Sequence, residues 1–307
     1  MSRILRDIAE WCPPALARAF GRPAALFFHG VEREIRDPGI QRNHHDAASF
    51  RAIARALKQN FDVLPLSALS DVMKAPERHS RALFLMSDDG YANTLTVAAD
   101  ILEEEGLPWT LFISTHHIDT GEWNPMTLAR LCGKSLEKQA AADEARLTLD
   151  TMLAEFGQAN LFETMERFPS ENFLDWEGVR ALQARGVEIG AHAHWHWPMN
   201  AAQTSDYLRE QALVPRARIA AQLGSCRAFA YPFGNTGDVS PEAWQAVRDA
   251  GYEYGFTTLS ASLDGGANPW LLPRYGLAPR EPNLAALVPL LRAGNGRLRH
   301  WQSRLAG

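Results

Sequence analysis

The sequence predicts an α/β protein built as a distorted parallel (β/α) barrel of about seven strands, with a helical insertion. Short apolar segments alternate with amphipathic helical segments along most of the 307 residues, and this alternation is typical of repeated β-α-β units. About six or seven such units suit a parallel barrel better than an open sheet. Histidine and aspartate gather at the predicted carboxyl ends of the strands, which is where both kinds of parallel sheet bind their ligands.

The strand and helix signals can be followed along the chain. The segment AALFFHG is short, apolar and closed by glycine, as expected of a buried parallel strand that ends at a functional rim. The first half then predicts, in order, strand 24–30, helix 47–59, strand 61–66, strand 82–90, helix 94–105 and strand 110–115. The second half predicts helix 176–185, strand 187–194, helix 205–223, strand 226–234, helix 241–250, strand 252–258 and a final segment 271–277.

We expect one barrel domain, residues 24–290, flanked by two short terminal segments. Residues 119–172 interrupt the alternation with a helical stretch rich in Ala, Glu and Leu, which we interpret as an insertion. Residues 1–23 are predicted to form a helical segment with an apolar face, for which packing onto the domain and shallow contact with a membrane surface are both open. Residues 291–307 are basic and contain glycine, which is typical of a solvated tail.

Composition and charge exclude several classes of protein. A formal net charge of -5 argues against a nucleic-acid partner, because such proteins carry a basic domain or stripe. Three cysteines that are far apart suit a reducing compartment and form neither a disulfide framework nor a zinc-finger spacing. The chain shows no run of about 18 apolar residues and no signal-peptide core. We therefore expect a cytoplasmic protein without a transmembrane segment; the pattern specifies no oligomeric state.

Two adjacent carboxylates, Asp88 and Asp89, follow one apolar strand. Like charges in a partly buried position are costly unless a cation compensates them. If Asp89 binds a metal ion, Asp88 is left beside it to take a proton from a water molecule, which is the arrangement for metal-assisted hydrolysis. The alternative is a structural turn, because Asp-Asp-Gly is also good turn chemistry.

Three histidines follow another predicted strand, in the sequence His192-Ala-His194-Trp-His196. Neutral imidazoles are common ligands of zinc, and two histidines with one carboxylate leave coordination positions open for water and substrate. His192 and His196 share one face if the chain turns helically just after the strand, whereas His194 at i+2 points away from an extended chain. We therefore predict a metal site formed by Asp89, His192 and His196. Zinc is the first choice, and nickel, cobalt or iron also suit these ligands.

From about Ala24 to Arg280, the chain resembles the polysaccharide deacetylases of the NodB-homology type, or carbohydrate esterase family four. Met86-Ser87-Asp88-Asp89-Gly90 is similar to the first family motif, Thr-Phe-Asp-Asp-Gly. The resemblance implies that Asp88 is the catalytic base and Asp89 a metal ligand. His192 and His196 match the second motif, although Ala193 replaces the usual Ser or Thr after the first histidine.

The third motif of that family commonly reads Arg-x-Pro-Tyr-Gly, and here the corresponding segment is Ala230-Tyr-Pro-Phe233-Gly. The resemblance implies that the Phe233 N–H donates to the oxyanion. The motif arginine, which orients the base in the family, is absent, and Arg274 is the candidate replacement, with a rim salt bridge as the alternative. His29 in FFHGVE is similar to an opening segment of these enzymes, and it is a candidate for the general acid or a wall of the pocket.

The resemblance implies metal-dependent hydrolysis of an N-acyl, most simply N-acetyl, amide on a sugar, with a carbohydrate as the partner. The expected substrate is a cell-surface polysaccharide or its lipid- or nucleotide-linked precursor. Two other functions stay open: a deformylase or other non-sugar amide hydrolase on the same scaffold, and an inactive relative that binds saccharide without turnover.

Overall fold

The structure is a computed structural model in which residues 22–277 and 279 are described. The predicted helical segment 1–23, apart from its last two residues, and the predicted basic tail 291–307 lie outside the described residues. Within the described part of the chain, no helix is both long enough and apolar enough to cross a bilayer.

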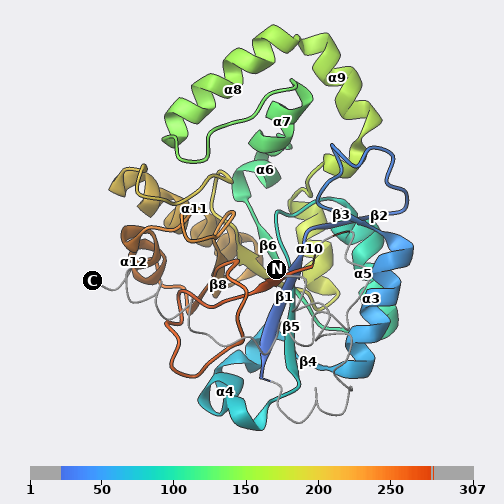
Figure 1. Cartoon of the computed structure of the whole chain (residues 1–307), viewed down its shortest axis with the longest axis vertical. Coiled ribbons are helices and arrows are strands. Elements are labelled where there is room, and N and C mark those ends of the chain that lie inside the picture. The colour runs from blue at the N-terminus through green and yellow to red at the C-terminus, as the bar shows by residue number, and fades with distance from the viewer. Residues whose placement is uncertain (1–21, 278, 280–307) are drawn as a thin grey trace, which may run out of the picture.

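The centre of the molecule is a curled, wholly parallel sheet (Figure 1). Seven strands follow one another in the order β10-β1-β5-β6-β7-β8-β9, and β4 pairs with β5 beside this path. The strands are β1 (Ala24–Phe28), β4 (Asp62–Val63), β5 (Ala82–Ser87), β6 (Thr110–Ile113), β7 (Glu188–Ala191), β8 (Ala228–Ala230), β9 (Tyr254–Phe256) and β10 (Tyr275–Gly276). A single parallel bridge from Phe256 to Leu272 connects the two ends of the curl. The predicted distorted (β/α) barrel of about seven strands is confirmed.

Helices surround this sheet. The five helical segments predicted around the barrel begin and end within two residues of their predicted positions. Helix α11 begins at Ser205, where the Thr204 side chain accepts a hydrogen bond from Tyr207 N, and ends before Gly224 in the left-handed conformation. The helices around the barrel are α3 (Ala47–Asn60), η1 (Leu66–Ala68), α4 (Leu69–Lys74), η2 (Pro76–Arg78), η3 (Thr94–Ala98), α5 (Ala99–Glu105), α6 (Thr115–Thr120), α10 (Trp176–Ala184), α11 (Ser205–Leu223) and α12 (Pro241–Asp249). Of these, η1, α4, η2 and α6 are additional to the predicted helices. Residues 94–105, predicted as one regular helix, begin with the π-helical turn η3 and continue as α5.

Alternation along the strands divides the buried side chains into two groups. In β5, Leu83 and Leu85 pack outward against the helices, while Phe84 and Met86 point into the curl of the sheet. Successive side chains of a strand point to opposite faces, so an uninterrupted apolar run can fill both. The inner group also contains Phe112, and this packed interior supports the carboxyl ends of the strands.

Between α6 and α10 the chain forms a separate helical layer at one end of the molecule (Figure 1). It contains α7 (Pro125–Leu131), α8 (Ala142–Phe156), α9 (Gln158–Arg167) and η4 (Pro169–Glu171). This layer has its own apolar cluster, which includes Trp195 and Trp197 from the segment after β7. The Trp197 indole donates a hydrogen bond to the Ala140 carbonyl oxygen (3.2 Å). The helical layer therefore rests on the segment that carries the predicted histidine ligands.

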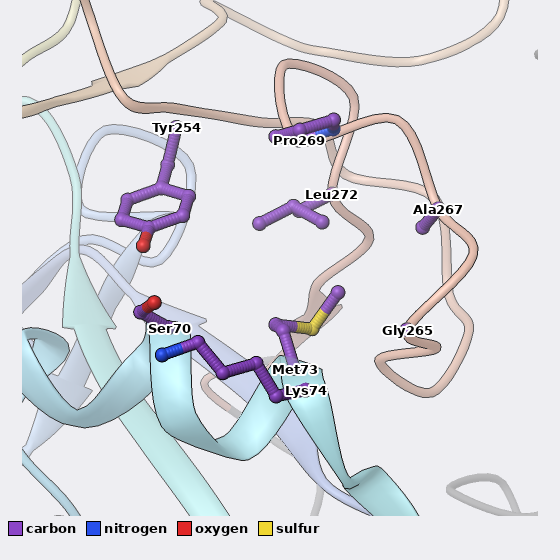
Figure 2. Close-up of a pocket in the computed structure, with 8 residues that line it drawn as sticks. All are labelled: Ser70, Met73, Lys74, Tyr254, Gly265, Ala267, Pro269 and Leu272. Carbon is purple, nitrogen blue, oxygen red and sulfur yellow. The ribbon is translucent and has the colours of Figure 1, made fainter.

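A cavity of about 420 Å³ lies at the amino end of the sheet, between α4 and the segment after β9 (Figure 2). Met73, Tyr254 and Leu272 point into it, and Lys74 at its edge pairs with Asp71 (2.9 Å). None of the described residues that line it is a histidine, a cysteine or a carboxylate. The cavity therefore lacks the groups that hydrolysis requires.

The bridge that connects the ends of the sheet predicts a strict requirement for glycine at position 255. A Cβ atom on Gly255 would lie 2.4 Å from the Trp270 carbonyl oxygen, so the backbone would have to move apart. We expect Gly255→Ala to lower the free energy of unfolding by about 1–3 kcal/mol, measured by urea denaturation. Gly266→Ala is the control: its Cβ would come no nearer than 3.9 Å to another residue, and we expect a change below about 0.5 kcal/mol. Equal losses in both variants would contradict this account.

Candidate active site

A pocket of about 370 Å³ opens at the carboxyl ends of the strands. Its lining brings together six of the seven predicted site residues: His29, Asp88, Asp89, His192, His196 and Phe233. The seventh, Arg274, is completely buried and contacts Asp88 from inside the sheet. Segments far apart in the sequence meet here because every strand of the sheet runs in the same direction.

Asp89, His192 and His196 form one buried cluster of potential metal ligands, whose ligand atoms all lie within 4.8 Å of one another. Asp89 Oδ1 lies 3.3 Å from His192 Nε2 and 3.0 Å from His196 Nε2. Burial by itself raises the pKa of Asp89, but the attraction of the two histidines outweighs it and holds the pKa well below its usual range. Asp89 is therefore ionised at neutral pH.

The surroundings of His192 fit a metal ion at this position. His192 Nδ1 donates its proton to the Ala230 carbonyl oxygen (2.7 Å), so the neutral ring has its lone pair on Nε2, which lies 3.2 Å from His196 Nε2 and 3.3 Å from Asp89 Oδ1. Asp89 Oδ1 is itself a buried oxygen without a hydrogen-bond partner among the described residues. A lone pair facing a carboxylate at this distance is repulsive unless a cation lies between them, and a divalent ion suits these donors.

His196 is held by a residue of the helical layer. Asn124 Nδ2 donates to His196 Nδ1 (3.0 Å), while Asn124 Oδ1 caps α7 by accepting from Met126 N. This arrangement puts the proton of a neutral His196 ring on Nε2, which faces His192 Nε2 (3.2 Å) and lies 3.0 Å from Asp89 Oδ1. A metal ion bound at Nε2 would leave the ring proton on Nδ1, which requires the Asn124 amide to turn its oxygen toward His196.

The turn that brings the two histidines together differs from the predicted one. We expected His192 and His196 to share a face through a helical turn after the strand, but no helix follows β7 directly. Ala193 instead adopts a left-handed conformation with φ of 61°, and the chain bends at that point. The helical-turn prediction is wrong because one left-handed residue reverses the path of the chain more sharply than a helical turn does.

Asp88 and Arg274 form a two-pronged ion pair below the metal-ligand cluster. Arg274 Nη1 and Nη2 donate to the two carboxylate oxygens of Asp88, each at 2.7 Å, and Arg274 Nε donates to the Thr257 carbonyl oxygen (3.2 Å). The rim salt bridge considered as an alternative is excluded for Arg274, because its side chain is fully buried. The position suits the orienting task that the sequence suggested for it.

The ion pair also keeps Asp88 in the form that a base requires. Burial raises the pKa of Asp88, but the attraction of Arg274, together with that of His192, outweighs burial and lowers the pKa below its usual value. Asp88 is therefore a carboxylate at neutral pH. A carboxylate with a low pKa is a weak base. It can still remove a proton here, because a divalent ion bound to the neighbouring ligand cluster would lower the pKa of its water.

Phe233 and His29 complete the pocket. Phe233 is left-handed, with φ of 60°, and its N–H makes no hydrogen bond to any described residue. His29 is half-buried at the end of β1, where burial lowers the pKa of its ring although Asp89 and Asp88 partly oppose this effect. His29 is therefore mainly neutral at pH 7, whereas Phe233 presents a free donor.

Two further histidines, His116 and His117, lie on helix α6, outside the pocket lining. His116 Nε2 contacts Glu122 Oε2 (2.6 Å), and His117 Nδ1 donates to the Glu122 carbonyl oxygen (2.8 Å). Burial lowers the pKa of His117 to about 3.

Sequence reasoning missed several residues of the pocket wall. Asn124, Arg130 and Lys138 come from the α7 region, and Arg42 comes from the segment between β2 (Gly30–Glu32) and β3 (His44–Asp46). The Asn-Pro pair at 124 and 125 signals a helix start. No spacing or periodicity signal shows which part of the barrel that helix faces.

Comparison with known proteins agrees with this geometry. The family described as Polysaccharide deacetylase matches residues 75–255, more than half of the chain. The chain belongs to the polysaccharide deacetylase family. It is thus a hydrolase that acts on carbon–nitrogen bonds other than peptide bonds. No curated protein matches it.

Solved structures of deacetylases share the fold. The Streptococcus pyogenes deacetylase PplD in complex with acetate is 16% identical, with a TM-score of 0.63 over 88% of this chain and 98% of that one. A de-N-acetylase from Aggregatibacter actinomycetemcomitans is 16% identical, with a TM-score of 0.60 over 88% and 99%. IcaB from Ammonifex degensii is also 16% identical, with a TM-score of 0.60 over 89% and 98%. At this identity the likeness concerns the fold.

The ion pair predicts how the pH dependence of the deacetylase responds to substitution. A base acts in its deprotonated form, so kcat/KM falls as the pH drops through the pKa of Asp88. In Arg274→Gln, burial is opposed only by the attraction of the nearby histidines, and we expect the acidic limb of the kcat/KM profile to move up by about 1–3 pH units. Arg274→Lys, which keeps the charge, should move it less.

Arg248→Gln removes an exposed arginine that pairs with Asp249, and it serves as the control whose acidic limb stays in place. An unchanged limb in both Arg274 variants would show that Asp88 does not determine the acidic side of the profile.

Proposed function

We propose that this deacetylase hydrolyses the N-acyl amide, most simply N-acetyl, of an amino sugar with the help of a divalent ion, zinc being the first choice. The observation that carries the proposal is the convergence of Asp89, His192 and His196 beside an ionised Asp88 in one pocket. Two imidazoles and one carboxylate are the donor set of hydrolytic metal sites that keep positions open for water and substrate.

Asp88 is the group to which we assign the removal of a proton from the attacking water. A divalent ion, when bound, would polarise the amide carbonyl and acidify the water. Asp88 borders the same pocket, and Arg274 fixes both of its oxygens, so that its orientation does not vary. A carboxylate held in this way acts as a base without rearranging.

Phe233 and His29 supply the remaining two tasks in this proposal. The free Phe233 N–H donates to the oxygen that becomes negative when the amide carbonyl is attacked. His29 delivers a proton to the departing amine from its protonated form, which is the minor form at neutral pH. Because burial lowers the pKa of His29, its protonated form is a stronger acid than an ordinary imidazolium and gives up that proton readily.

Acetyl is the acyl group that we favour. The structurally similar Streptococcus pyogenes deacetylase was solved with acetate, and another structurally similar protein is a de-N-acetylase. The proposed substrate is a surface polysaccharide or a lipid- or nucleotide-linked precursor of one. The cytoplasmic location expected from the sequence remains a prediction, and it favours the precursor.

Metal content is the first test of this proposal. We expect elemental analysis of the purified protein, after reconstitution, to find near one equivalent of a transition ion, and Asp89→Ala and His192→Ala to lose it. His116→Ala is a matched control, because this histidine pairs with Glu122 away from the pocket and should leave the metal content unchanged. A wild type that stays free of metal would contradict the proposed hydrolase and leave saccharide binding without turnover.

The second test separates metal binding from proton removal. We expect Asp88→Asn to keep its metal and to lower kcat about 100- to 10,000-fold, because the amide cannot accept the water proton. Acetate and formate are measured together as they are released from acylated amino-sugar oligomers. Formate as the product would favour a deformylase, and an unaltered kcat in Asp88→Asn would exclude Asp88 as the base.

A further inference from the structure

Three basic side chains, Arg42, Arg130 and Lys138, line the pocket that contains the carboxylates and histidines. We call them the basic rim. They come from three segments: Arg42 from the stretch between β2 and β3, Arg130 from α7, and Lys138 from the stretch between α7 and α8. None of the proposed steps of hydrolysis uses them.

The basic rim has no acidic partner within the described part of the chain. Arg42, Arg130 and Lys138 make no ion pair there, in contrast to most of the exposed arginines on the barrel. Arg130 Nη2 donates only to Thr127 Oγ1 (2.8 Å), and Arg130 Nε is a buried donor without a partner. An unpaired donor at a partly buried cation is costly unless a ligand completes it.

The acidic groups closest to the rim are already engaged. Asp88 is neutralised by Arg274, and Asp89 belongs to the metal-ligand cluster. Glu171 contacts His44 Nε2 (2.8 Å), and Asp238, which attracts Lys138, accepts a hydrogen bond from Asn235 N (3.0 Å). The residues that line the pocket therefore carry three basic groups against two carboxylates, one of which is paired with Arg274. A bound divalent ion would add to this positive charge.

Arg42 and Arg130 are close enough to affect each other. Burial lowers the pKa of the Arg130 guanidinium, and repulsion from Arg42 acts in the same direction, while Tyr91 and Glu171 partly oppose the shift. The stretch that carries Arg42 is nevertheless fixed, because Gln41 Nε2 donates to Ser170 Oγ (3.0 Å) and His44 is bound by Glu171. Two like charges held together in this way favour an anion between them.

Lys138 shows where such an anion would lie relative to the reaction. Its ammonium group sits 4.0 Å from the centre of the Phe233 ring, and the same ring lies 5.0 Å from that of His196. The positive charge of Lys138 therefore lies next to Phe233, whose N–H would donate a hydrogen bond to the oxyanion. An anion held by Lys138 would belong to the acylated sugar itself or to the group attached directly to it.

We infer that the substrate is an anionic saccharide, with a phosphate or carboxylate on the acylated sugar that binds to Arg42, Arg130 and Lys138. This inference rests on the proposed function and specifies its substrate class. A glycosyl phosphate and a uronic acid would present the same charge to the rim, and the experiment below distinguishes the two sources.

The test compares three probes: N-acetylglucosamine 1-phosphate, the methyl glycoside of N-acetylglucosaminuronic acid, and the neutral methyl glycoside of N-acetylglucosamine. Binding to the metal-loaded protein is measured by calorimetry, and acetate release is measured separately. We expect one anionic probe to bind at least about tenfold more tightly than the neutral one. The tighter of the two identifies phosphate or carboxylate as the group recognised.

Variants of the rim show whether it causes this difference. We expect Arg130→Gln and Lys138→Gln each to reduce the anionic-to-neutral affinity ratio roughly tenfold. Lys134→Gln removes a lysine close in sequence that pairs with Glu155 outside the pocket, and it should keep the wild-type ratio. Lys138 is half-buried, so its variant remains informative if Arg130→Gln lowers stability.

The two proposals fail in different ways. An anionic probe that binds no better than the neutral one, or not at all, overturns the inference, and so does an advantage that survives in both rim variants, because the metal would then be its source. Acetate release from the neutral probe would at the same time leave the deacetylase proposal intact. Rim-dependent binding of an anionic probe without any acetate or formate release would instead overturn only the proposed hydrolysis.

Discussion

The ion pair between Arg274 and Asp88 is the interaction on which the rest of this molecule depends. The guanidinium lies inside the curl of the sheet, 4.4 Å from the Phe27 ring centre and 5.5 Å from that of Phe112. Taking one charge out of water is expensive, and removing only one partner of a buried pair costs about 3–5 kcal/mol. The same contact joins the segment before β10 to the end of β5. One contact thus both helps to close the barrel and keeps the proposed base ionised.

Within the described residues, the three non-glycine residues with left-handed backbone either line the pocket or directly follow a residue that does. Asp89, Ala193 and Phe233 have φ values of 77°, 61° and 60°. Such conformations cost on the order of 1–2 kcal/mol each and persist only where surrounding packing fixes them. Here each of them turns the chain so that a carboxylate, an imidazole or an N–H faces the pocket. The packed interior of the sheet supplies the stabilisation that offsets this strain.

The sequence predicted the barrel and the metal-ligand cluster because both follow from local patterns. Apolar periodicity defines the strands and helices, and parallel strands bring their carboxyl ends together, so Asp89 and His192 were expected to meet. The turn at Ala193 was not predictable, since alanine rarely adopts a left-handed conformation. The sequence also could not predict that Arg130 and Lys138 face the pocket. It depends on where the helical layer folds back, and that path is set by tertiary packing rather than by neighbours in the chain.

The segment after β7 contributes both to the metal-ligand cluster and to the apolar cluster of the helical layer. His196 lies between Trp195 and Trp197, and these tryptophans are part of the apolar cluster of the helical layer. Arg146 of α8 stacks over the Trp195 ring at 4.8 Å. Replacing this layer, for example to admit a different saccharide, would therefore also displace His196, one of the predicted metal ligands. Substitutions of single side chains on the layer would change the pocket wall and leave His196 in place.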